Sequence, residues 1–122
     1  MINQLGQVML YVSNLDESKQ FWTEKLGFEV IVDNADAPVR GIEIAPPGAA
    51  TRIVLFNKEQ VAELHPEMNY GTPSLMFFTD KFDELYSGLK EKNVTVGEIV
   101  EIPERVFNFA DDEDNYFAVM EK

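Results

Sequence analysis

The chain has 122 residues, of which 45% are hydrophobic and 11% aromatic, so it is long enough for one domain with a substantial core. It contains no cysteine, which excludes disulfides, thiolate metal sites and a cysteine nucleophile. The formal net charge of −12 argues against binding to nucleic acid or to an anionic membrane, because like charges repel. We find neither a signal-peptide pattern nor an apolar run of the ~18 residues that cross a bilayer, and we expect a cytoplasmic protein.

The first half of the chain predicts a strand, a helix and three further strands. Leu5–Val12 is a short apolar run typical of a buried strand. Asn14 and Glu17 have the spacing of a capping box, and apolar residues at helical spacing then predict a helix over Leu15–Lys25, which Gly27 ends. The three strands that follow are predicted at 28–33, 39–44 and 50–56.

The second half predicts the same order of elements after a connecting segment, 58–72. Pro73–Thr79 has a strand pattern, and Asp80 is placed to cap a second helix. The apolar face of that helix comprises Phe82, Leu85, Tyr86 and Leu89. The remaining strands are predicted at 93–102, 105–110 and 116–120, with an acidic turn at 111–115.

Strands outnumber helices and follow each helix in a group, which favours an α+β fold over an alternating α/β fold. We predict one domain, 1–122, made of two βαβββ modules at about 5–57 and 73–121, joined by the linker 58–72. No glycine-rich loop suits a dinucleotide or a triphosphate.

Two segments carry a resemblance to a known family. The segment VMLYVSNLDESKQFWTEKLGFEV resembles the opening of vicinal oxygen chelate proteins, the superfamily of glyoxalases, bleomycin resistance proteins and extradiol dioxygenases. The closing segment FADDEDNYFAVME resembles their last hairpin. The resemblance implies a cup of curved mixed sheet around a ligand pocket, and a homodimer.

The resemblance also implies where a catalytic metal would be held in members that use one. The four ligand positions fall on Gln7, Val54, Ser74 and Val119. Two of these side chains offer no lone pair and the other two are weak neutral donors, so we expect no metal and no cofactor. The single histidine, His65, lies in the linker before Pro66 and suits a surface position better than a ligand position.

If the four positions face the cup, the two-residue period of strands predicts which neighbours face it too. The complete predicted lining is Gln7, Met9, Tyr11, Arg52, Val54, Phe56, Ser74, Met76, Phe78, Phe117 and Val119. An apolar surface with a few polar groups is typical of a small-molecule site, although the same residues would also serve as ordinary core. Arg52 is predicted either to pair with a carboxylate or an anionic ligand, or to lie in water at the end of its strand.

Three functions remain open from the sequence. The first is a metal-independent protein that binds a small, partly aromatic ligand, as bleomycin resistance proteins do. The second is a lyase, isomerase or dioxygenase whose metal is held by other groups, such as Gln7, Glu43 and Glu121 in a shifted register. The third is a scaffold whose cup is filled by its own side chains. For the acidic turn Asp111–Asn115, the composition favours an ordinary turn over a calcium site.

Overall fold

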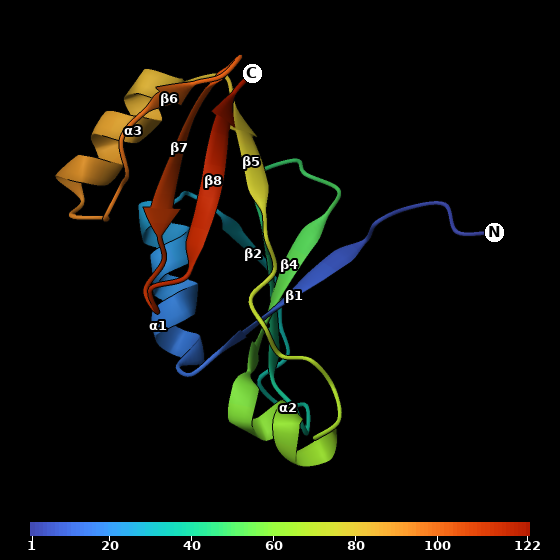
Figure 1. Cartoon of the computed structure of the whole chain (residues 1–122). Coiled ribbons are helices and arrows are strands. Elements are labelled where there is room, and N and C mark those ends of the chain that lie inside the picture. Colours follow the sequence, from blue (N-terminus) through green and yellow to red (C-terminus); the bar gives the residue numbers. More distant parts are fainter. The chain divides into compact units, whose positions relative to one another are not determined.

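The computed structural model describes all 122 residues, Met1–Lys122, which form two compact units, Met1–Pro73 and Ser74–Lys122 (Figure 1). Each unit contains one four-stranded sheet in which the first strand is parallel to the last. The other strand pairs are antiparallel. The α+β fold with a repeated order of strand, helix and three strands is confirmed. No helix has the length and apolar character needed to cross a membrane.

The sheet of the first unit has the strand order β1-β4-β3-β2. Its strands are β1 (Gln7–Val12), β2 (Glu29–Asp33), β3 (Gly41–Ala45) and β4 (Arg52–Asn57). The predicted first helix is present as α1 (Leu15–Gln20), which continues as a π-helical turn, η1 (Phe21–Lys25). A short helix, α2 (Lys58–Leu64), follows β4 directly.

Both ends of the first helix have the predicted signals. The side chain of Asn14 accepts a hydrogen bond from the backbone N–H of Glu17 at 3.1 Å, which satisfies one of the free donors of the first turn. After the last turn, Gly27 has φ +76°, a conformation that side chains with a Cβ rarely adopt. The helix therefore begins and ends where local chemistry dictates.

One face of the first sheet is buried beneath the helix. Helix α1 packs against β4, and Trp22 of η1 is fully buried. Six strand residues that alternate toward this side are buried: Leu10, Val12, Ile42, Ile44, Ile53 and Leu55. The opposite face contains exposed residues, among them Gln7 and Met9, and we call it the open face of the first unit.

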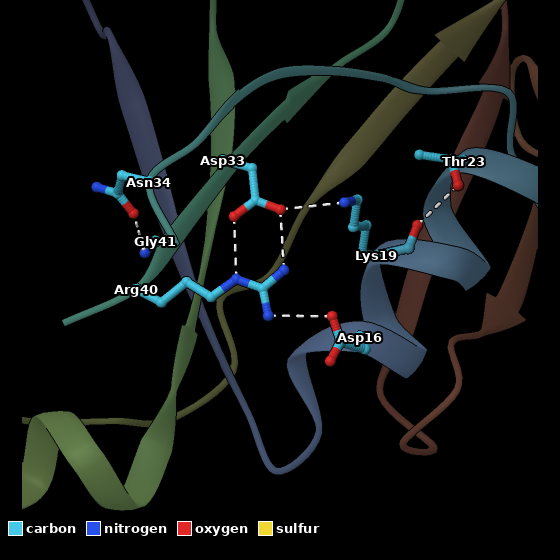
Figure 2. Close-up of polar contacts among 7 residues, drawn as sticks. All are labelled: Asp16, Lys19, Thr23, Asp33, Asn34, Arg40 and Gly41. Carbon is cyan, nitrogen blue, oxygen red and sulfur yellow. Dashed lines mark hydrogen bonds and ion pairs between the residues drawn. The ribbon is translucent and has the colours of Figure 1, made fainter. Parts of the chain in front are cut away.

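A polar network joins the helix to the β2–β3 hairpin (Figure 2). Arg40 donates from Nε and Nη2 to the two carboxylate oxygens of Asp33, both at 2.9 Å, and from Nη1 to Asp16 on α1 at 3.0 Å. Lys19 donates to the same Asp33 at 3.0 Å. At the start of β3, the side chain of Asn34 accepts from the N–H of Gly41 at 2.6 Å. The network fixes the hairpin against α1.

The sheet of the second unit has the strand order β5-β8-β7-β6. Its strands are β5 (Met76–Thr79), β6 (Val100–Glu101), β7 (Arg105–Ala110) and β8 (Tyr116–Glu121). Helix α3 (Phe82–Glu91) covers one face: the ring of Phe107 makes edge contacts with Phe82 and Tyr86. Phe107 is 1% exposed, so this side of the sheet is the core of the unit.

Two expectations for the second unit are wrong in detail. Helix α3 begins at Phe82 with Lys81 at the cap position and no side-chain cap, so Asp80 does not cap it. The segment 93–102 forms a strand only at Val100–Glu101, with one isolated bridge between Val96 and Phe109. Asn93 adopts a positive φ of 63°, which is not a strand conformation. Between Asn93 and Val100, the bridge at Val96 is the single β-pairing with β7.

The register of β8 corrects two of the predicted lining residues. Met76 pairs with Ala118 and Phe78 with Met120, and paired residues on neighbouring strands point to the same face. Phe117 and Val119 point to the other face of the sheet. There they pair with Phe109 and Phe107 on β7, and they are 2% and 1% exposed. The prediction that they share a face with Met76 and Phe78 is therefore wrong by one residue, and a one-residue shift reverses the face.

The Asp33 network makes a prediction about stability. The hydrogen bonds from Arg40 hold the pKa of Asp33 well below its ordinary value of 3.8. The unfolded chain therefore takes up the proton first, so this stabilisation is complete at neutral pH and is lost as pH falls below about 4. We expect Asp33→Asn to lower the free energy of unfolding at neutral pH by about 1–2 kcal/mol.

Urea unfolding at neutral pH and at about pH 3 checks this prediction. The difference between wild type and Asp33→Asn should narrow at the lower pH. Asp36→Asn, which removes an exposed carboxylate from the same hairpin, should change little at either pH. An equal loss at both pH values for Asp33→Asn would contradict the assignment.

The two faces of the second sheet predict opposite responses to truncation. Phe117→Ala should lower the free energy of unfolding by about 3–5 kcal/mol, because it leaves a cavity in the core. Phe78→Ala, at a side chain that is 60% exposed, should change it by less than about 1 kcal/mol. Chemical denaturation of both variants tests the register, and similar losses in the two would contradict it.

Candidate functional site

The open face of the first unit is a small grid of side chains set by strand register. Parallel pairing aligns Gln7 with Arg52, Met9 with Val54, and Tyr11 with Phe56. Antiparallel pairing adds Glu43 beside Val54 and Gly41 beside Phe56. The six predicted lining residues of this module therefore do share one face, with a polar row, an apolar row and an aromatic row in succession. The structure adds Glu43 and Gly41 to them.

The aromatic row is a stacked pair with a third ring at its edge. The rings of Tyr11 and Phe56 are 6.2 Å apart and inclined by 22°. Tyr70 meets Tyr11 edge-on at 4.8 Å. Gly41 permits this arrangement, because a Cβ at that position would lie 2.8 Å from Cε1 of Phe56, closer than the ring allows. The Phe56 ring therefore covers the strand at Gly41.

Tyr70 is anchored by the end of α2. Its hydroxyl donates to the carbonyl oxygen of His65, the residue that ends the helix, and to that of Val61, which also accepts the backbone N–H of His65. Partial burial and the nearby carboxylate of Glu67 raise the pKa of Tyr70, so the hydroxyl stays a donor. The sequence places this residue only in the linker, and nothing in its local pattern singles it out.

The polar row contains one ion pair. Arg52 Nη1 donates to Glu43 Oε1 at 2.8 Å, and Gln7 Nε2 donates to the same oxygen at 3.4 Å. Of the fates predicted for Arg52, the structure shows pairing with a carboxylate. Glu43 interrupts the apolar strand GIEIA, and this single charge among apolar residues is the signal by which sequence could have placed it on the open face.

The residues present do not fit a divalent cation. No three His, Cys, Asp or Glu side chains converge anywhere in the chain. Gln7 and Glu43 do lie together, but Arg52 brings a positive charge to the same oxygen, and a guanidinium repels a metal ion.

The third member of the alternative metal set is committed elsewhere. Glu121 accepts two hydrogen bonds from Arg105, which also binds Asp83 on α3. Glu121 pairs with Thr79 in the sheet. Thr79 is next to Phe78 in the strand, so it points away from the open face. Glu121 therefore points to the helix side. The shifted register suggested for Glu121 is therefore wrong. The predicted ligand position Val119 also points to the helix side, where it pairs with Phe107.

The second unit presents its own open face. Met76 and Phe78 of β5 are 47% and 60% exposed, and Ala118 and Met120 of β8 stand beside them. The ammonium of Lys122 lies 4.5 Å from the centre of the Phe78 ring, a cation–π contact. Ser74 precedes β5 and is exposed.

The acidic turn is an ordinary hydrogen-bonded turn. One carboxylate oxygen of Asp111 accepts the backbone N–H groups of Glu113 and Asn115, both at 2.9 Å. Its other oxygen accepts from the side chain of Asn115 at 3.1 Å. These are the contacts by which Asp stabilises turns. His65 caps α2 and its exposed side chain lies 3.8 Å from Glu67.

Known proteins with similar sequence or structure agree with this architecture. The uncharacterized protein YetH of Bacillus subtilis is 33% identical over 99% of this chain and 100% of its own length. The crystal structure of TnmS3, an antibiotic binding protein from a Streptomyces species, is similar with a TM-score of 0.84 and 27% identity, covering 98% of this chain and 96% of that one.

A member of the glyoxalase/bleomycin resistance protein/dioxygenase superfamily from Sphaerobacter thermophilus has a TM-score of 0.83 and 26% identity, covering 99% and 98% of the two chains. The family model described as Glyoxalase/Bleomycin resistance protein/Dioxygenase superfamily matches residues 4–118. With two βαβββ units and nearly full coverage, the chain belongs to the glyoxalase/bleomycin resistance protein/dioxygenase superfamily.

Proposed function

We propose that the protein binds a small, partly aromatic ligand without a metal ion. The observation that carries the proposal is the open face of the first unit, where an apolar row of the exposed Met9 and the buried Val54 lies between a stacked aromatic pair and an ion pair. Surfaces of this composition bind small molecules through apolar contact and orient them through a few polar groups. Met9, which is 38% exposed, adds a flexible side chain that adapts to ligand shape.

The similarity to an antibiotic binding protein supports the same conclusion. Fold likeness by itself is a weak argument for function, but here the chain's own side chains point the same way. The positions that the resemblance assigns to a metal ion contain Gln7, Val54, Ser74 and Val119. None of these is a strong ligand.

A second part of the proposal concerns the open face of the second unit. Met76, Phe78 and Tyr116 expose about half or more of their surface, and exposed apolar groups that gather on one face mark interaction sites. We propose that the protein is a homodimer in the cytoplasm and that Ser74, Met76 and Phe78 form a ligand-binding surface on the second unit. Sedimentation velocity tests the homodimer, and cell fractionation tests the location.

Metal binding gives the sharpest test of the main proposal. We expect the natively purified protein to contain no stoichiometric metal, because Arg52 and the lack of a ligand cluster oppose it. Elemental analysis should be combined with calorimetric titration of zinc, nickel, manganese and iron(II), which we expect to give no heat of binding. Stoichiometric metal with sub-micromolar affinity would overturn the proposal and return the protein to the enzymes of its superfamily.

Ligand binding at the open face makes a further prediction. In a thermal-shift screen of aromatic and cationic antibiotics, a ligand that binds the native state raises the melting temperature. We expect Met9→Glu to abolish the shift of any compound that stabilises wild type, because it puts a charge into the apolar row.

Met68→Glu is the matched control, because Met68 is 51% exposed and lies outside the sheet. It should leave the shift unchanged. Equal shifts in wild type and in both variants would place the ligand elsewhere.

A further inference from the structure

The ion pair on the open face of the first unit has hydrogen-bonding capacity left over. Both hydrogen bonds to the Glu43 side chain end on Oε1, so Oε2 remains an acceptor without a partner in the protein. Arg52 uses only Nη1 of its guanidinium, so Nε and Nη2 remain donors. The side chain of Arg52 is 39% exposed and that of Glu43 is 21% exposed, so a molecule that binds on this face reaches both.

The pair also limits the charge of such a molecule. A ligand anion at this point is attracted by Arg52 and repelled by Glu43, and a ligand cation meets the reverse, so the two contributions largely cancel. Either ion would still lose its hydration on an apolar surface. An uncharged group with a donor beside an acceptor satisfies both side chains at once.

The spacing of the rows sets the length and shape of the rest of the ligand. Phe56 follows Arg52 by four residues on one strand, a distance of about 13 Å at about 3.3 Å per residue. Only Met9 and Val54 lie between them on β1 and β4. A rigid molecule that reaches from the ion pair to the aromatic pair therefore has a long, flat, apolar body.

We propose that this face selects planar, uncharged fused-ring compounds that present an N–H or O–H donor next to a carbonyl oxygen. Arg52 donates to the carbonyl, Glu43 accepts from the donor, and Tyr11 and Phe56 receive the distant ring. The inference rests on the proposed function and specifies its ligand class. It also assigns Glu43 to the site as a residue that determines specificity.

Four flat compounds of similar size serve as probes. Phenanthridin-6(5H)-one has a lactam N–H beside its carbonyl and no charge. Its N-methyl derivative lacks the donor, phenanthrene-9-carboxylate is an anion, and 9-aminoacridine is a cation at neutral pH. Their affinities are measured by isothermal calorimetry or fluorescence on the full chain at neutral pH.

For wild type we expect the lactam to bind about tenfold more tightly than its N-methyl derivative, because methylation leaves Glu43 without its hydrogen bond. The lactam should also bind more tightly than either ion. Glu43→Gln should weaken the lactam about tenfold and strengthen the carboxylate about tenfold, because Arg52 then lacks its counterion. Arg52→Met should shift the preference toward the cation, because Glu43 then lacks its counterion.

Lys58→Met and Glu59→Gln are matched controls, because they remove exposed charges at the start of α2. Neither should alter the order of affinities, and melting temperatures report whether each variant is folded. Equal binding of the lactam and its N-methyl derivative in every variant would overturn the assignment of Glu43 and Arg52 and leave the proposed function standing. No binding of any probe to folded wild type would overturn both.

Discussion

One helix can cover only one face of a four-stranded sheet, and in each unit of this protein one helix, α1 or α3, covers one face, while the short α2 contacts β4. The two-residue alternation of strands then divides every strand into a buried set and an open set. In the first unit the buried set consists of aliphatic residues such as Leu10 and Leu55, beneath α1. The open set includes polar side chains that a core does not require, namely Gln7, Glu43 and Arg52.

The polar network on the helix side contributes to the geometry of the open face. Arg40 and Asp33 hold the β2–β3 hairpin to α1, and Asn34 fixes the backbone at Gly41. Gly41 is the residue that the Phe56 ring covers, and Glu43 follows two positions later on the same strand. Contacts between a helix and a hairpin thus set the position of both the aromatic row and the carboxylate.

The guanidinium of Arg52 lies beside Gln7, the residue that the sequence resemblance predicts at a metal-ligand position. A metal ion and a guanidinium both bring positive charge to oxygen atoms, but they recognise those atoms in different ways. A divalent cation binds several oxygens at once as a Lewis acid, whereas a guanidinium donates directed hydrogen bonds in a plane. With Glu43 as counterion, the site keeps a donor and an acceptor and has little net charge, which suits recognition and orientation of a ligand.

The sequence by itself determined the family, the repeated order of elements and the first helix with its Asn14 cap and Gly27 terminus, because these depend on local patterns and short-range hydrogen bonds. It also determined that Gln7, Met9, Tyr11, Arg52, Val54 and Phe56 share a face, since β1 and β4 are regular strands. Only the tertiary structure decided the register of β8, where a one-residue difference turned Phe117 and Val119 into the core. The pairing of Arg52 with Glu43 and the arrival of Tyr70 beside Tyr11 likewise depend on neighbours distant in the chain, which no local pattern encodes.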